Sequence, residues 1–191
     1  GQHGDALRLA VAAVHAWDGD GRWAVGAALV GDALSRVRPD PAPAGHPTRG
    51  ADAQAAAVDP VEWAWGAWAA GYVSGTYEAN RREYDRMLVA AGIARDAGQA
   101  VLEAHLHFRL AIGAGYGGDL AAGLRHIDRL RTLVEQLDSD YGRMMLEHLD
   151  ALAALTTGDA DRAARGLHAA AERAEAMAAP ADAARAWRLH A

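Results

Sequence analysis

The amino-acid sequence predicts an all-α protein built from antiparallel helix pairs. Apolar residues recur at steps of three or four along almost the whole chain, which is the period of an amphipathic helix. No segment alternates apolar and polar residues convincingly, as a half-buried strand would. Helix-capping residues separate the periodic stretches from one another. Together these observations predict a stack of helices with short connections, forming one domain over residues 1–191.

The composition sets the character of the expected core. Apolar residues make up 51% of the chain, but many of them are alanine and only one is Phe. Alanine is the best helix former and adds little volume, so Ala-rich helices can approach one another closely. The bulk of the core must therefore come from Leu, Val, Met and the six Trp residues.

Charge and cysteine content exclude several classes of function. The net charge is −6 and no stretch is strongly basic, which argues against direct binding of nucleic acid. The chain has no cysteine, which excludes disulfides and thiolate chemistry and favours a cytoplasmic location. The longest uncharged stretch, residues 63–77, contains three glycines and is too short to span a membrane. No signal peptide is visible. Because the chain opens on Gly1 rather than Met and helical periodicity begins almost at once, we expect a fragment of a longer protein.

Helix boundaries follow from capping signals. Asp59 precedes Pro60, which is a strong start signal. Asp119 and Asp159 each follow a glycine at an N-cap position. The Pro-rich segment 38–50 cannot propagate a helix and is expected to be an exposed loop. The expected helices span residues 4–17, 22–37, 60–74, 77–96, 99–114, 119–138, 141–157, 160–178 and 180–190, with residues 51–58 as a further short one.

The clearest apolar stripe lies in the expected helix 119–138. Its members recur at steps of three or four and therefore share one face, with charged residues elsewhere. We expect this face to be buried against the neighbouring helices. The stripe consists of Leu120, Leu124, Ile127, Leu130, Val134 and Leu137.

A repeat links two of the helix pairs. When the Gly-Asp pair at 118–119 is placed over the pair at 158–159, small residues coincide, and large aliphatic residues coincide one turn later. A fixed period of this kind in helix pairs is typical of a solenoid. The alternative is an irregular helical bundle whose Gly-Asp turns coincide by chance. The matching residues are Gly123 with Ala163 and Ile127 with Leu167.

The Gly-Asp-x-x-x-small-x-x-x-large pattern resembles a tetratricopeptide repeat. The period and the Ala-, Arg- and Leu-rich style are similar to the helical arrays of MalT/LuxR-type ATP-dependent transcriptional regulators of high-GC bacteria, mostly over residues 77–178. The resemblance implies a tetratricopeptide-like α-solenoid, or α-α superhelix, that senses an inducer or a partner. In such regulators an upstream NTPase and a terminal helix-turn-helix act. This sequence has neither a phosphate-loop pattern nor a recognisable DNA-reading helix, so neither activity is carried over.

Residues 113–118 fit the G-x-G-x-x-G pattern of dinucleotide-binding loops. Such a site needs a strand before the glycines, so that the pyrophosphate meets a helix N-terminus at the end of a parallel sheet. Here a helix is expected before the glycines, and Asp119 stands where its charge would repel phosphate. We interpret residues 113–118 as a turn between helices and expect no nucleotide cofactor.

Metal sites are not predicted either. His105 and His107 are two residues apart on a helix and point about 200° apart, so they cannot share a metal ion. Glu103 with His107 supplies two ligands at most, and the sequence assures no third. We expect satisfied or solvent-facing histidines instead. The acidic motifs at 18–20 and 138–140 lack the Glu that ends a calcium loop and are interpreted as turns with helix caps.

No catalytic residues are predicted. The chain has no cysteine, no nucleophile elbow and no pair of carboxylates whose closeness can be argued. Ser35, Ser74 and Ser139 lie at expected helix ends or in stretches of small residues, with no base implied nearby.

Aromatic residues provide the candidate binding surface. Trp65 and Trp68 lie about 60° apart on the helix that begins after Asp59, whereas Trp63 points about 200° away from Trp65. We expect the face of Trp65 and Trp68 to be core and Trp63 to face a groove; the alternative is a helix sandwiched between neighbours. Tryptophan is enriched at binding hot spots. The candidate partner or ligand surface comprises Trp63, Trp65, Trp68, Tyr72 and Tyr84.

These observations favour a non-enzymatic interaction or regulatory module that binds a protein segment or a sister domain along a concave surface. One alternative is a pocket for a small-molecule effector between helix pairs, lined by some of the same aromatic residues. A second alternative is an unrecognised enzyme of a biosynthetic pathway. An open groove would favour the first hypothesis, and a deep pocket with several polar groups would favour the others.

Overall fold

The computed structural model of the chain describes residues 2–14, 23–39, 55–73 and 77–190. Helices make up most of these residues, so the all-α class predicted from the sequence is confirmed. Among the described helices, none is both long enough and apolar enough to cross a membrane. The helices are α1 (Gln2–Ala12), α3 (Trp23–Ser35), α4 (Pro60–Val73), α5 (Tyr77–Asp96), α6 (Ala100–Tyr116), α7 (Leu120–Leu137), α8 (Asp140–Thr156), α9 (Ala160–Ala176) and α10 (Pro180–His190).

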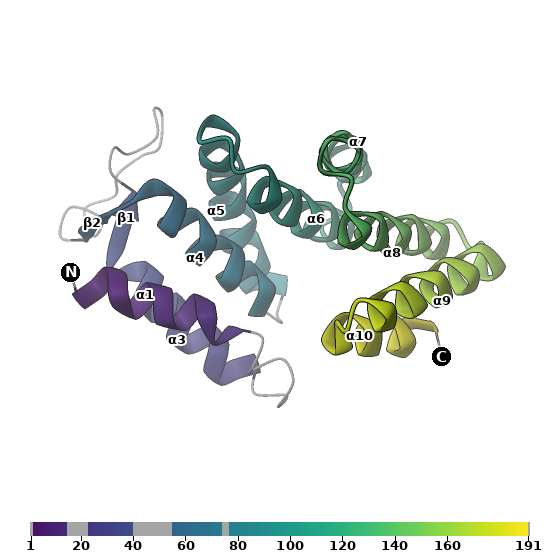
Figure 1. Cartoon of the computed structure of the whole chain (residues 1–191), viewed down its shortest axis with the longest axis horizontal. Helices are drawn as coiled ribbons and strands as arrows, with labels where there is room; N and C mark the ends of the chain where they lie inside the picture. Colours follow the sequence, from purple (N-terminus) through teal and green to yellow (C-terminus); the bar gives the residue numbers. More distant parts are fainter. Residues whose placement is uncertain (1, 15–22, 40–54, 74–76, 191) are drawn as a thin grey trace.

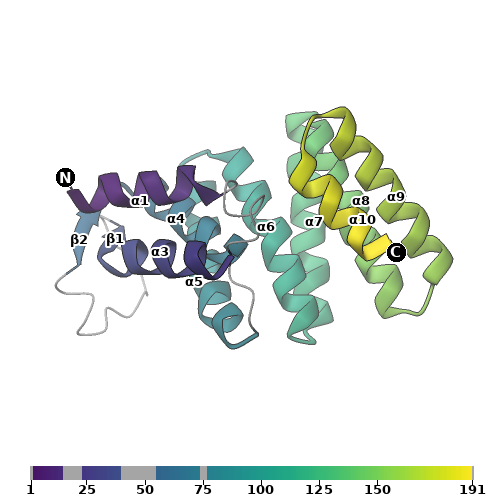
Figure 2. The same cartoon turned by 90° about the horizontal axis from the view of Figure 1, so that it is seen from below.

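Helices that follow one another along the chain lie against one another, from α3 and α4 through to α9 and α10. Figure 1 shows α1, α3 and α4 gathered at one end, α6 and α8 in the middle, and α9 and α10 at the other end. The two termini lie at opposite ends of the molecule in Figures 1 and 2. Contacts also join alternate helices, α4 with α6 and α6 with α8. These three helices therefore form a continuous layer.

The turns between the later helices are closely similar. A residue in the left-handed conformation follows each helix from α5 to α9, at regular intervals along the chain. After four of these helices, the next residue donates its N–H to an alanine carbonyl in the last turn of the helix, as Asp119 does to Ala114 at 3.0 Å. Glycine adopts this conformation without strain, which explains the glycines at three of the five turns. The five residues are Gly98 (φ 67°), Gly118 (φ 76°), Asp138 (φ 46°), Gly158 (φ 78°) and Ala178 (φ 54°).

The predicted N-caps are confirmed. Each capping carboxylate accepts a backbone N–H of the first turn, as the capping rule requires. The bonds run from Val61 to Asp59 at 2.9 Å, from Ala122 to Asp119 at 2.9 Å and from Arg162 to Asp159 at 3.1 Å. Ser139 caps α8 in the same way, so the 138–140 motif is a capped turn as expected.

Two short strands were not expected. β1 (Val37–Pro39) and β2 (Ala56–Val58) pair in parallel, with Val37 opposite Ala56 and Pro39 opposite Val58. The further helix considered for 51–58 is therefore wrong for 56–58, and the expected loop 38–50 begins with two strand residues. Such short segments cannot show an alternating pattern, so periodicity could not find them. The remainder of the Pro-rich loop lies outside the described residues.

The glycine-rich segment 113–118 is mostly helical, which corrects its interpretation as a turn. α6 continues to Tyr116, and only the residues after it form the turn. Gly113 allows α5 to pack closely, because a Cβ atom at this position would lie 3.0 Å from Cδ2 of Tyr84. The glycine therefore serves helix packing. A helix does precede the segment, as expected.

The stripe on α7 is only partly buried, which corrects the prediction for its first two members. Leu130 and Val134 are buried, but Leu120 and Leu124 are each 59% exposed. At this end of α7 the small residues Ala122 and Gly123 face inward instead. A Cβ atom on Gly123 would lie 3.7 Å from the carbonyl oxygen of Ala111, so α6 and α7 cross too closely here for large side chains.

The described part of the core falls into two clusters. One joins α1, α3, α4 and α5 to Leu102, Leu106 and Leu110 of α6, and the other joins α6, α7, α8, α9 and α10. In the first cluster, α4 approaches α1 and α3 closely at Gly66. A Cβ atom there would lie 2.7 Å from Leu7 and 3.0 Å from Leu34, so glycine is required for this packing.

Candidate functional site: an aromatic ladder across alternate helices

A row of ring contacts begins on α4 and crosses to α6. The rings of Trp65 and Trp68 meet edge to face, with centroids 5.5 Å apart. The imidazole of His105 on α6 lies 5.5 Å from the Trp68 ring and 6.4 Å from the Trp65 ring. These are ordinary distances for favourable aromatic pairs.

The row continues to α8 and α10. The ring of Tyr141 on α8 lies 5.3 Å from the ring of His105. The hydroxyl of Tyr141 donates to Oδ2 of Asp182 on α10 at 2.9 Å. We call Trp65, Trp68, His105 and Tyr141, with Asp182 at the end, the aromatic ladder. Its members come from the alternate helices α4, α6, α8 and α10.

A second link between α4 and α6 supports the tryptophan end of the ladder. Arg109 of α6 donates from Nη2 to the carbonyl oxygen of Gly71 at 2.6 Å. Its guanidinium carbon also lies 5.7 Å from the centre of the Tyr72 ring, at cation–π distance. The Tyr72 ring is in turn 5.3 Å from that of Trp68. This end of the ladder is therefore fixed by both packing and a charge-assisted hydrogen bond.

The ladder is partly accessible. Trp68 and Tyr72 are buried, whereas Trp65, His105 and Tyr141 are half-buried. Beside His105 and Tyr141 lies a hollow of about 210 Å³, with Val101 and Leu137 among its other lining residues. Pockets that enclose small molecules usually measure about 300–1,000 Å³. This hollow is therefore better suited to one side chain of a partner than to a whole ligand.

The structure reverses one expectation about α4. Trp63 is only 4% exposed and belongs to the core, so the prediction that it faces a groove is wrong. Trp68 is core as expected, but Trp65 on the expected core face is half-buried and in contact with His105. Tyr84 does not join the ladder. It lies in the α5–α6–α7 interface, where its hydroxyl is 3.1 Å from Nε2 of His126.

Sequence reasoning missed four residues of this site: His105, Arg109, Tyr141 and Asp182. The repeat contained part of the signal, because His105 follows Trp65 by the same offset that separates Asp159 from Asp119. Arg109 and Tyr141 had no such signal, since neither stands at an aromatic position of the preceding pair. Their role depends on how the helices stack.

The motifs considered for metals do not form a metal site in the described ranges. His105 turns toward the ladder and His107 toward His126, where the two Nδ1 atoms are 2.9 Å apart. Within residues 2–14, 23–39, 55–73 and 77–190, no three possible ligands come together. The acidic motif at 18–20 lies outside these ranges.

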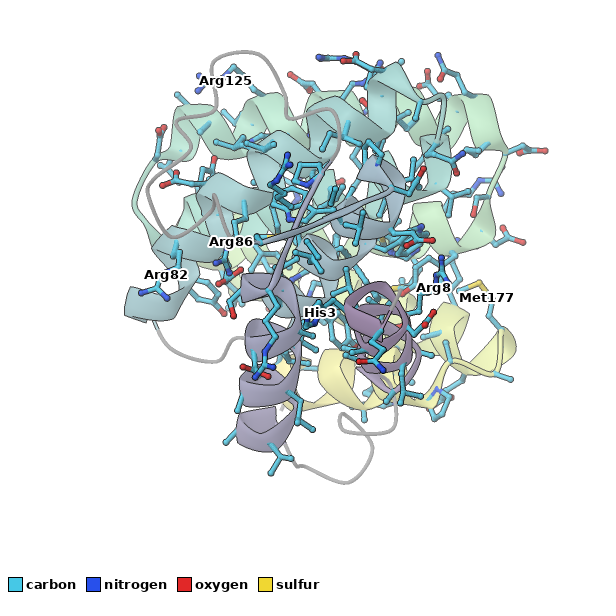
Figure 3. All side chains as sticks on the ribbon, turned by 90° about the vertical axis from the view of Figure 1, so that its left-hand side faces the viewer. His3, Arg8, Arg82, Arg86, Arg125 and Met177 are labelled. Carbon is cyan, nitrogen blue, oxygen red and sulfur yellow. The ribbon has the colours of Figure 1, made fainter. Side chains whose placement is uncertain are left out.

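A second hollow lies at the N-terminal end of the molecule. It measures about 400 Å³ and is lined by α1 and α3, with Leu9 and Leu29 on its apolar walls and His3, Asp32 and Arg36 around them. Figure 3 looks toward this end and shows His3 in the region of these two helices. Few polar groups converge here, so the hollow lacks the features of a catalytic pocket.

No protein-family model, no curated protein and no solved structure matches this chain.

Proposed function

We propose that the chain is a non-enzymatic helical-repeat module that binds a protein segment across α4, α6 and α8. The segment would carry an aromatic or aliphatic anchor, which contacts the half-buried rings of the ladder. The observation that carries the proposal is the ladder itself, a row of rings across successive helix pairs, of which Trp65, His105 and Tyr141 are half-buried.

Helix positions support a regular repeat. The first residues of α4, α6, α8 and α10 are evenly spaced, at Pro60, Ala100, Asp140 and Pro180. The left-handed residues of the turns recur at half this interval. A pair of helices of about equal length, joined by like turns, is the unit of a tetratricopeptide-like solenoid.

Burial follows the same period. Trp68, Phe108 and His148 stand at equivalent positions of successive pairs, and all three rings are buried. The same holds in the second helices, where three equivalent residues are completely buried. Residues at equivalent positions are thus buried alike, which supports a repeat over a chance similarity of turns. The second-helix set is Ala90, Leu130 and Ala170.

Ring chemistry favours a protein segment as the partner. Tryptophan and tyrosine bring large contact area with few rotatable bonds, and they dominate binding hot spots. Of the rings, only the imidazole of His105 can carry a positive charge, so apolar contact is expected to supply most of the affinity. The small hollow gives little support to the alternative of a small-molecule effector. Membership of a transcriptional regulator, or binding of a sister domain within one, stays a prediction from the resemblance.

Selection from a random peptide library tests the proposal. Peptides are selected on the immobilised chain, and the dissociation constant of the best peptide is measured by isothermal calorimetry. Tyr141→Ala and Trp65→Ala should each weaken binding by about tenfold or more, as hot-spot truncations do.

Leu124→Ala is the matched control, because Leu124 is an exposed apolar residue of α7 outside the ladder. It should leave the dissociation constant unchanged, and circular dichroism should show all three variants folded. Peptides whose affinity is insensitive to both ladder substitutions would rule the ladder out as the binding site.

A further inference from the structure

A line of polar side chains lies in the interface of α5, α6 and α7. The Tyr84 hydroxyl of α5 is 3.1 Å from Nε2 of His126 on α7, whose Nδ1 is 2.9 Å from Nδ1 of His107 on α6. Nε2 of His107 is 3.7 Å from Oε1 of Glu103. Arg129 of α7 ends the line by donating to both Glu103 oxygens, at 2.8 and 3.1 Å. Five titratable side chains thus connect three helices.

The positions of the hydrogens along this line follow from its Glu103–Arg129 end. Because the Glu103 carboxylate accepts two bonds from Arg129, the nitrogen of His107 that faces it, Nε2, carries the hydrogen. Nδ1 of neutral His107 is then an acceptor, so His126 must donate from its Nδ1. Nε2 of His126 is left to accept from the Tyr84 hydroxyl. The opposite arrangement would turn a lone pair of His107 toward a carboxylate.

We propose that His107 and His126 form a proton-sensitive latch across the α5–α6–α7 interface. The latch is closed while the two imidazoles share one hydrogen, and a proton on Nδ1 of His107 opens it. A first extra proton can bind Nε2 of His126 without breaking the line, because the Tyr84 hydroxyl can rotate from donor to acceptor. Once His126 carries that proton, a second proton on Nδ1 of His107 cannot be accommodated. It would bring two N–H groups face to face over 2.9 Å.

The surroundings keep the latch closed at neutral pH. Burial, and then the neighbouring His126, lower the pKa of His107 to about 4, against a smaller opposing effect of Glu103. Burial, and then Arg125, lower the pKa of His126. The groups that face the two imidazoles are Tyr84 and Arg95 of α5, Glu103 of α6, and Asp119, Arg125 and Arg129 at the cap and along α7.

The fold does not require this latch. In the proposed repeat register, Glu147 and Gly166 of α8 and α9 stand where α6 and α7 have His107 and His126. The α8–α9 pair packs closely without any imidazole between its helices at these positions. His105 and His107 lie on different faces of α6, so the same helix carries both the latch and the middle of the ladder.

Imidazole nitrogen NMR on the ¹⁵N-labelled chain tests the latch directly. At neutral pH, His126 should carry its hydrogen on Nδ1 and His107 on Nε2, with scalar coupling between the two Nδ1 nuclei through the shared hydrogen. On acidification His126 should titrate first with the coupling retained. The coupling should vanish as His107 titrates near about pH 4. Two Nε2–H tautomers at neutral pH would overturn the proposal.

A double-mutant cycle gives a second readout that needs no assignment of nitrogen signals. At neutral pH, His107→Gln and His126→Gln should each lower the folding equilibrium constant several-fold, and the double variant should lose little more than one single variant. His3→Gln, at an exposed position of α1, serves as the control and should have little effect. Additive losses for His107→Gln and His126→Gln would contradict a direct bond between the two imidazoles.

Discussion

The α6–α7 and α8–α9 helix pairs share a scaffold but differ in what lies between their helices. In both, a left-handed glycine and an Asp cap join the two helices. In both, an arginine of the second helix forks onto a glutamate of the first. The glutamate of α6 is Glu103, which is only 3% exposed and continues into the histidine line. That of α8 is Glu147, which is half-buried beside Arg173.

The comparison separates the features that both helix pairs share from those that only one pair has. Turns and caps recur at equivalent positions of both pairs, so they belong to the helix-pair unit. The Arg–Glu fork occurs in both pairs but not at equivalent positions, because Glu147 stands where α6 has His107. The paired imidazoles occur in the first of these pairs, where the second has Gly166; a Cβ atom there would meet Ala151 at 2.9 Å. At the position of His126, the α8–α9 pair thus packs through a small residue, whereas the α6–α7 pair packs through an imidazole.

The largest effect is expected from the shared core. Leu130 is completely buried on α7, whereas Leu124 of the same helix is mostly exposed. Leu130→Ala should lower the free energy of unfolding by about 3–5 kcal/mol through lost burial and a residual cavity. Leu124→Ala should change it by less than about 0.5 kcal/mol. Urea unfolding of both variants checks the comparison, and equal losses would mean that α7 packs on a different face.

Acid should destabilise the α6–α7 pair through His107. Its pKa is lowered to about 4 in the folded chain. Between the ordinary histidine pKa of about 6.5 and this value, the unfolded chain binds more protons, so stability falls as the pH falls. The contribution of His107, complete above about pH 6.5, should shrink by roughly 2–3 kcal/mol by about pH 4.

His107→Gln removes this titration, so the variant should lose less stability than the parent chain over the same pH interval. Urea unfolding at several pH values measures the difference. Leu124→Ala, at an exposed position of α7 that does not titrate, provides the control and should follow the parent curve. If the free energies of unfolding of His107→Gln and of the parent chain changed in parallel with pH, His107 would lie outside the interface.

The two forks should differ in strength because their glutamates differ in burial. Glu103→Gln weakens a charge-assisted fork inside the protein and should cost about 1–3 kcal/mol. Glu147→Gln affects a more exposed fork and should cost less than about 1 kcal/mol. Thermal melts of the two variants at neutral pH provide the comparison. A larger loss for Glu147→Gln would show that the α8–α9 pair depends more on its fork.

The smallest effects concern the turns. Gly118→Ala places a side chain in the left-handed conformation and should cost about 1 kcal/mol. Ala178→Gly relieves the same strain and should stabilise by less than about 1 kcal/mol. Gly115→Ala is the control, since this residue is helical with open space around its Cβ position. A stabilising Gly118→Ala would argue against the shared turn geometry.

Local signals predicted most of the fold. Caps at Asp59, Asp119 and Asp159 and the periodicity gave nearly every helix, because both depend on neighbours in the chain. The side of α4 that faces outward could not be predicted, because α1, α3, α5 and α6 all contact this helix and it has no polar face. The prediction therefore placed Trp65 in the core and Trp63 at a groove, whereas in the structure Trp63 is in the core and Trp65 is half-buried.

Contacts between alternate helices were equally invisible to local reasoning. His105 and Tyr141 are far apart in the sequence, and only the stacking of α6 on α8 brings their rings together. The exposure of Leu120 has a similar origin. Its place on an apolar stripe predicts burial, but the crossing of α6 and α7 selects the small residues beside it.

Mapping a bound peptide on the chain by backbone-amide NMR tests the central claim most directly. The best library peptide is added to the ¹⁵N-labelled chain, and amide shift changes are compared between the alternate helices α4, α6 and α8 and the intervening helices α5, α7 and α9. We expect the largest changes around Trp65, His105 and Tyr141, with little change on the outer faces of α5, α7 and α9. Changes centred on α7 around Leu120 and Leu124, with the ladder amides unmoved, would contradict the claim that the ladder is the binding surface.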